Sequence, residues 1–300
     1  MTNIGAVELL KHARANNYAV GYFEAWNLES LYAVVRAAEA AKSPVMIGFC
    51  GEYLNNPDRK YKVDLNLYAD LARKIAASAS VPVSTLLNEA VDIDMTYRGI
   101  RAGFDMVMFV DEHMPVEELT PIQKKLVEFA HACGVAVEAE VGALGMANQS
   151  TGVTHAGYKS DPDIAAKFVR DTGVDALAVS IGNIHLLEGR KAELDMDLLE
   201  KLNQKIPVPL VLHGGTGIDK QDFKATIERG IAKVNVGAGL KRVVISQEKS
   251  YFSENDVSKM NPNDILGKGG KLDLESRSYD ALMEEVIEFI KAFGGLNKAF

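Results

Sequence analysis

Eight short apolar runs, separated by longer amphipathic stretches, constrain the fold of this chain more than any other feature. Short β-branched runs bounded by turn residues are typical of buried strands, and the stretches between them repeat apolar residues at helical spacing. Eight strand–helix units of roughly thirty residues predict a parallel (β/α)8 TIM barrel, with a doubly wound open sheet as the alternative. The expected strands are Tyr18–Phe23, Pro44–Phe49, Val81–Leu87, Asp105–Val110, Val135–Glu140, Asp175–Ile181, Val208–His213 and Ile231–Val236.

The alternation continues along almost the whole chain, which predicts one barrel domain over residues 1–300. Residues 251–276 depart from the pattern, because they are polar and rich in Asn, Gly and Lys. Such a composition indicates a surface excursion, and residues 279–293 then show a helical pattern. We therefore expect a C-terminal helical extension over about residues 251–300.

Composition limits the function. The chain has 300 residues, of which 47% are hydrophobic and 25% charged, as in ordinary soluble domains. A formal net charge of −8 argues against nucleic acid and anionic membranes as partners, since both require a basic face. No apolar run has the length of a signal peptide or a membrane span, and Cys50 and Cys133 form no metal or disulfide spacing. We expect a cytoplasmic protein that acts on a small molecule.

A TIM barrel concentrates its chemistry at the carboxyl ends of its strands. Glu138 and Glu140 are two residues apart in one expected strand, so both point to the same side. Imidazole and carboxylate groups that converge on one rim suit zinc or a similar divalent ion. Taken singly, each residue has a plainer interpretation as a solvated charge or a packed side chain. The candidates at the strand ends are Glu24, Asn88, Glu89, Glu138, Glu140, His185, His213 and Asn235.

The stretch HGGTG, residues 213–217, follows the seventh expected strand. Its glycines permit close approach of the backbone to a bound group, and the next helix start favours negative charge. His213 stands where a strand-end imidazole meets a ligand. The alternative interpretation is a tight turn beside a core histidine.

Several blocks resemble the class II, metal-dependent fructose-bisphosphate aldolase family, and the resemblance runs from end to end. The similar blocks include VEAEVGALG, TGVDALAVSIGNIH, PLVLHGGTGI, GIAKVNV and VIEFIKAFGGLNKAF. The resemblance implies a (β/α)8 barrel, a zinc ion that stabilises an enediolate of dihydroxyacetone phosphate, and a homodimer or homotetramer. It also implies that His185 and His213 are metal ligands. The substrate-binding residues that it implies are Gly182, Gly214, Gly215, Thr216, Asn235 and Gly237.

The departures from the family pattern lie around the expected pocket. The family's Asp-His pair, a proton donor and a zinc ligand, is replaced by Asn88 and Glu89. Leu186 and Ala238 stand where the family has Gly and Thr near the phosphate, so we expect weaker phosphate binding. Glu24 replaces an Asn at the start of the first loop.

A carboxylate can replace an imidazole in a zinc site. We therefore predict a divalent metal held by Glu89, His185 and His213, with Glu140 at a position that binds or flanks the metal in the family. The added negative charge favours ions that prefer oxygen, so Mn2+, Co2+ and Mg2+ are alternatives to Zn2+.

Asn88 occupies a catalytic position but cannot exchange a proton as an Asp does. Like-charge repulsion between Glu138 and Glu140 should raise the pKa of one of them, and we assign the proton to Glu138, with Glu24 as second choice. The predicted function is a metal-dependent aldolase-type lyase for a ketose or a similar phosphorylated ketose. The alternatives are an inactive barrel with a binding or regulatory role, and another metal-assisted reaction at a carbonyl.

Overall fold

Eight parallel strands close into a barrel in the order β1-β11-β10-β8-β5-β4-β3-β2. This computed structural model describes residues 5–148, 152–155, 157–185 and 192–300, with the backbone alone at 146–148, 152–155 and 185. The barrel confirms the predicted (β/α)8 fold and excludes the open sheet. Each predicted strand is present: β1 (Val20–Glu24), β2 (Val45–Cys50), β3 (Val83–Ala90), β4 (Met106–Phe109), β5 (Ala136–Val141), β8 (Ala176–Val179), β10 (Leu210–Leu212) and β11 (Ile231–Val236).

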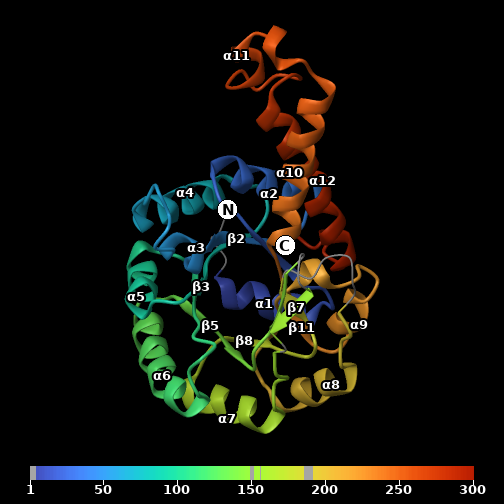
Figure 1. Ribbon diagram of the computed structural model, residues 1–300. Helices are drawn as coiled ribbons and strands as arrows, with labels where there is room; N and C mark the ends of the chain where they lie inside the picture. Colours follow the sequence, from blue (N-terminus) through green and yellow to red (C-terminus); the bar gives the residue numbers. More distant parts are fainter. Residues whose placement is uncertain (1–4, 149–151, 156, 186–191) are drawn as a thin grey trace.

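Helices surround the barrel and alternate with its strands (Figure 1). Side-chain caps define several of their starts. The Asn27 side chain accepts a hydrogen bond from the Ser30 backbone N–H, and the Asp161 side chain accepts hydrogen bonds from the backbone N–H groups of Asp163 and Ile164. The outer helices are α2 (Leu28–Ala41), α3 (Gly51–Asn55), α4 (Leu65–Ser78), α5 (Ile93–Ala102), α6 (Val116–Ala132), α7 (Pro162–Thr172), α8 (Met196–Lys205) and α9 (Phe223–Ile227).

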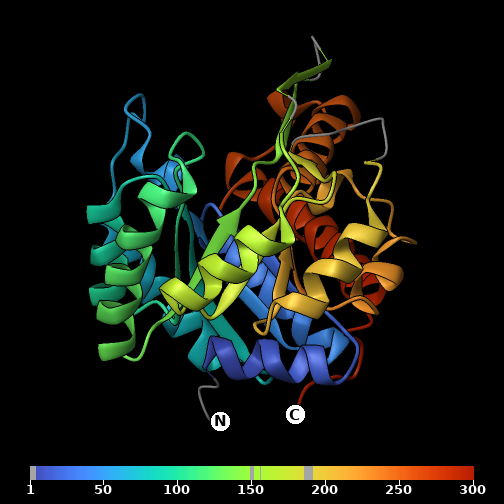
Figure 2. The same ribbon diagram turned by 90° about the horizontal axis from the view of Figure 1, so that it is seen from below.

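Helix α1 (Ala6–Ala15) covers the amino ends of the strands. Its Leu9 and Leu10 are buried in a cluster with the barrel side chains Tyr22, Met46 and others. Figure 2 shows α1 and both chain ends at this end of the barrel, and a green hairpin at the opposite end. An apolar plug at one end leaves the carboxyl ends of the strands as the open face for chemistry.

The hairpin belongs to a small second sheet of β6 (Gly145–Asn148), β7 (Gly152–His155) and β9 (Ile184–His185), in the order β7-β6-β9. These strands follow β5 and β8 in the chain, which explains their place beside the barrel mouth. These strands were not predicted from the sequence, because runs this short show no clear periodicity.

The C-terminal segment forms an arm that extends beyond the barrel (Figure 1). It consists of α10 (Ala238–Glu254), the 3-10 turn η2 (Val257–Lys259), α11 (Pro262–Ile265) and α12 (Leu274–Ala292). Helix α12 begins five residues earlier than the pattern at Tyr279 predicted, since Asp273 accepts a hydrogen bond from the Ser276 backbone N–H. The polar excursion is therefore shorter than expected. No described helix is long and apolar enough to cross a membrane.

Candidate active site at the barrel mouth

His213 lies directly after β10 and is fully buried between carboxylates. Its Nδ1 atom is 2.9 Å from Glu89 Oε1 and 4.0 Å from Glu140 Oε2. Its Nε2 atom is 3.0 Å from Glu138 Oε1. The ring thus has two different sides, with Nδ1 toward Glu89 and Glu140 and Nε2 toward Glu138 and the Asn235 side-chain amide, whose Nδ2 is 2.9 Å away.

These contacts determine the charge of the ring in the absence of a metal. Burial by itself lowers the pKa of His213, but the hydrogen bonds to Glu138 and Glu89 raise that pKa to about 10. The ring is therefore a cation held between two carboxylates. A metal at Nδ1 would replace one of its protons.

A buried lysine holds Glu138 in place. Glu138 is 0% exposed, and its Oε2 atom accepts a hydrogen bond from Lys233 Nζ at 2.7 Å. Lys233 is also fully buried, with Nζ 5.2 Å from the centre of the Tyr22 ring. Both carboxylate oxygens of Glu138 are thereby paired with side chains of the core.

The prediction that the Glu138 pKa is raised is wrong. Burial raises that pKa, but the charges and hydrogen bonds of Lys233 and His213 outweigh burial and lower it. The prediction rested on the two neighbouring carboxylates and did not include Lys233. A signal was present, because a lysine inside the apolar run Ile231–Val236 is buried only with a partner.

Glu140 has the environment that had been expected for Glu138. It is 9% exposed, and its Oε1 atom has no hydrogen-bond partner among the described residues. Burial raises its pKa to about 8, with the charges of Glu89 and Glu112 adding to the rise against the opposing effect of His213. The carboxyl group with an unsatisfied buried oxygen is therefore Glu140.

The backbone at the end of β3 brings Asn88 and Glu89 to the same face. Alternate residues of a strand normally point to opposite sides. Glu89, however, has a left-handed conformation with φ +48, and the β3–β4 register shifts between Leu87 and Ala90. Asn88 Oδ1 accepts a hydrogen bond from Asn235 at 3.3 Å while Glu89 reaches His213. Such backbone conformations cost about 1–3 kcal/mol and persist where surrounding contacts hold them.

Glu24, at the end of β1, forms an ion pair with Lys241 in the first part of α10. Burial raises the pKa of Glu24, and the Lys241 charge opposes that rise. A Cβ atom added at Gly237, the N-cap of α10, would lie 2.9 Å from Glu24 Oε2. Lys241 was also missed from the sequence, and the signal was its position one helical turn after Gly237.

The glycine loop packs against the same helix start. A Cβ atom at Gly215 would lie 2.8 Å from the Asn235 carbonyl oxygen, and Thr216 Oγ1 accepts a hydrogen bond from Gly239 N at 3.0 Å. Gly214 has φ +70, which favours glycine. The loop and the Asn235–Gly239 segment are therefore in direct contact. These close approaches require glycine with or without a ligand, so substrate binding by the loop stays a prediction.

Gly182 lies in a different environment from the glycine loop. Its φ is +109, and a Cβ atom there would lie 2.2 Å from the Glu193 carbonyl oxygen. Chain packing alone therefore requires glycine at this position. A direct contact of Gly182 with substrate stays a prediction.

Two predicted positions lie outside the described side chains. The His185 backbone is part of β9 and pairs with Met146 of β6, but its side chain is not described. Leu186 lies wholly outside the described residues. That His185 reaches His213 to bind the same ion therefore stays a prediction.

The donor set was compared with what a divalent ion requires. No group of three or more His, Cys, Asp or Glu side chains in the described part of the chain is arranged to hold a metal ion. Glu89 Oε1 and His213 Nδ1 are 2.9 Å apart, and two ligands of one tetrahedral zinc lie about 3.4 Å apart. Imidazole and carboxylate are suitable zinc donors, so Glu89 and His213 suit such an ion in their chemistry, with His185 as the expected third ligand.

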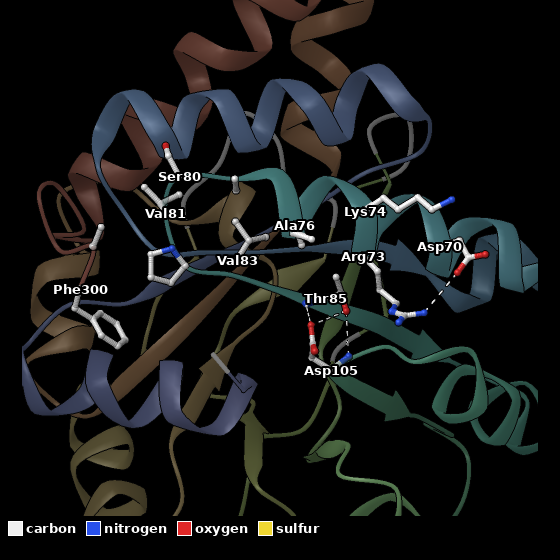
Figure 3. A pocket seen from close by; sticks show the side chains of 14 residues that line it. Asp70, Arg73, Lys74, Ala76, Ser80, Val81, Val83, Thr85, Asp105 and Phe300 are labelled. Atoms are coloured by element: carbon white, nitrogen blue, oxygen red, sulfur yellow. Dashed lines mark hydrogen bonds and ion pairs between the residues drawn. The ribbon is translucent and has the colours of Figure 1, made fainter. Parts of the chain in front are cut away.

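A cavity of about 620 Å³ lies elsewhere, at the amino ends of β3 and β4 (Figure 3). It is bordered by α4 residues and by Phe300, and its Asp105 accepts hydrogen bonds from the Thr85 N–H and hydroxyl. None of the candidate site residues lines it. The cavity is therefore separate from the barrel mouth.

Comparisons with known proteins agree with the geometry. The profile of the class-II fructose-bisphosphate aldolase family matches residues 5–298. A fructose-bisphosphate aldolase of Streptococcus pneumoniae is 37% identical, with all of both chains covered. One from Geobacillus stearothermophilus is 32% identical and covers 100% of this chain and 99% of its own.

Among solved structures, the YdjI aldolase of Escherichia coli K12 superposes with a TM-score of 0.80 at 29% identity, with 100% of both chains covered. The family profile, the aldolase relatives and this solved structure all match the chain over nearly its full length. The chain therefore belongs to the class II fructose-bisphosphate aldolase family and is an aldolase-type lyase.

Proposed function

We propose that this lyase cleaves or forms a carbon–carbon bond of a ketose or ketose-phosphate-like substrate with a divalent metal held by Glu89, His185 and His213. Class II aldolases depend on such an ion, which polarises the substrate carbonyl when bound. Zn2+ suits the imidazole donors, and Mn2+, Co2+ and Mg2+ are the alternatives. The observation that carries the proposal is the contact of His213 Nδ1 with Glu89 beside the buried oxygen of Glu140.

Two buried side-chain oxygens at the barrel mouth support a substrate site there. Glu140 Oε1 and Asn235 Oδ1 have no hydrogen-bond partner among the described residues. Buried polar atoms are normally paired, so unpaired ones next to a catalytic cluster favour a bound ligand or ion. In our proposal Asn235 Oδ1 accepts a hydrogen bond from a substrate hydroxyl, and the contacts of Asn235 Nδ2 with Asn88 and with His213 Nε2 orient the amide.

The proton exchange is assigned to Glu140. Glu138 has both oxygens paired within the core, and Asn88 has no exchangeable proton. Glu140 keeps one oxygen without a partner on the Nδ1 side of His213. It therefore replaces Glu138 as the group that takes the proton from the substrate hydroxyl and returns it.

Glu140→Gln is expected to lower kcat by about 10²–10⁴-fold, because the amide keeps the shape and loses the exchangeable proton. Steady-state kinetics on a substrate that the wild-type protein cleaves measure this change. Glu112→Gln is the matched control, since it removes the same charge from an exposed neighbour and should change kcat little. Near-normal turnover by Glu140→Gln would contradict the assignment.

The activity itself is tested with metal-loaded protein and a panel of phosphorylated and unphosphorylated ketoses, with aldehyde release as the readout. Turnover that a chelator abolishes and added metal restores is the expected result. No turnover of any ketose in either direction would contradict the proposed activity and favour the inactive barrel as a binding or regulatory protein. Isomerisation without aldehyde release would favour the other metal-assisted reaction.

We also propose a cytoplasmic homodimer or homotetramer. The C-terminal arm supports assembly, because it extends from the barrel and exposes Ile245, Phe252 and Leu266. One barrel domain over residues 1–300 stays part of the same proposal.

A further inference from the structure

We propose that Glu24 determines substrate specificity, because its carboxylate occupies the position beside α10 where an anionic substrate group would bind. The lyase would then select a ketone that ends there in an uncharged hydroxyl and would discriminate against phosphate. This inference rests on the proposed function for the reaction, but its argument comes from the contacts of Glu24.

The strand pairing carries the Glu24 side chain to the start of α10. β1 pairs with β11, and Phe23 is opposite Val236. Glu24 and Gly237 are therefore the residues that directly follow this pair in the two segments. Glu24 Oε2 lies close above the bare Cα of Gly237, where a Cβ atom would be only 2.9 Å away. Glu24 Oε1 accepts a hydrogen bond from Lys241 Nζ. One oxygen of the carboxylate is thus paired with a cation, and the other lies against the N-cap glycine of the helix.

Several features make this position suitable for an anion. Helix α10 has 17 residues, and its N-terminus favours negative charge. Lys241 adds a full positive charge one turn into the helix, and the Lys241 side chain is 31% exposed. Gly237 has no side chain, so the Glu24 carboxylate approaches its Cα closely, while the Gly239 N–H donates a hydrogen bond to the Thr216 hydroxyl. The Glu24 carboxylate therefore occupies a position that would otherwise suit an anionic ligand.

A second anion would have to displace Glu24. The displaced carboxylate would remain near Glu52 and Glu89, whose charges already raise the pKa of Glu24. Lys241 is the cation that both anions would need, and its Nζ is also 4.4 Å from the centre of the Tyr53 ring. A substrate hydroxyl, in contrast, can donate a hydrogen bond to Glu24 with the ion pair intact. The arrangement therefore favours a hydroxyl over a phosphate.

The test replaces Glu24 and measures binding by titration calorimetry of the full-length protein at its natural metal content. Inorganic phosphate and dihydroxyacetone phosphate should bind Glu24→Gln at least about tenfold more tightly than wild type, because the amide leaves Lys241 without its anion. Dihydroxyacetone should bind the variant equally or less well. Glu24→Asn serves as the second variant if Glu24→Gln does not fold.

Two further variants separate local from general charge effects. Glu52→Gln removes the same charge from the exposed mouth without touching the pair with Lys241, so phosphate affinity should change less than about threefold. Lys241→Met added to Glu24→Gln should abolish the gain. Equal phosphate affinity in wild type and Glu24→Gln, or an equal gain from Glu52→Gln, would overturn the proposal. Because the titration needs no turnover, this result is independent of whether a ketose is cleaved.

Discussion

His213→Ala is expected to abolish metal retention and to lower turnover by at least about 10³-fold, whereas wild-type protein purified without chelator should carry about one divalent ion per chain. The substitution removes Nδ1, which is 2.9 Å from Glu89 Oε1, and leaves Glu89 and the expected ligand His185. Two remaining ligands rarely hold zinc. Elemental analysis of both proteins and steady-state kinetics measure the two effects.

His113→Ala is the control for this prediction. His113 follows β4 on an exposed part of the chain, so its loss should leave the metal content unchanged. Circular dichroism of His213→Ala tests whether the variant is folded, because the change also leaves Glu138 with Lys233 alone. Absence of metal from wild type, or equal metal in wild type and His213→Ala, would contradict the site.

Lys233→Met is expected to reduce the free energy of unfolding by about 3–5 kcal/mol, because it leaves a fully buried carboxylate at Glu138 without its nearest cation. The methionine fills much of the volume of the lysine stem, so the loss reports the charge rather than a cavity. Urea denaturation followed by circular dichroism measures the change. Lys167→Met, which breaks a solvent-exposed pair with Asp171, should leave the free energy of unfolding nearly unchanged.

A double variant identifies the cause. Lys233→Met combined with Glu138→Gln removes both charges and should recover most of the lost stability, since the amide oxygen still accepts a hydrogen bond from His213. A loss below about 1 kcal/mol in Lys233→Met would contradict the buried ion pair as a stabilising contact. A double variant no more stable than Lys233→Met would assign the loss to packing instead.

The architecture of the barrel was accessible from the sequence because it depends on local patterns. Apolar runs such as Asp175–Ile181 and the amphipathic stretches between them repeat along the chain, and eight such units predicted the closed barrel that the structure shows. The helix starts were less accessible, as α12 shows: Asp273 begins it before its apolar pattern becomes regular. The small sheet of β6, β7 and β9 was not predicted, since its strands are too short to show a period.

Strand ends and alternation are properties of the chain order, so the sequence also predicted that Glu24, Asn88, Glu140 and His213 reach the barrel mouth. Which charges meet there depends on the folded barrel. Lys233 and Glu138 are 95 residues apart in the chain, and Lys241 and Glu24 are 217 apart.

Those pairings, with the left-handed backbone of Glu89, decide which carboxylate stays without a partner. Electrostatic energy depends on distance and burial, and neither quantity follows from the spacing of residues along the chain. The sequence therefore predicted that carboxylates line the mouth, and the fold decided that Glu138 is neutralised by Lys233 while Glu140 keeps an unpaired oxygen.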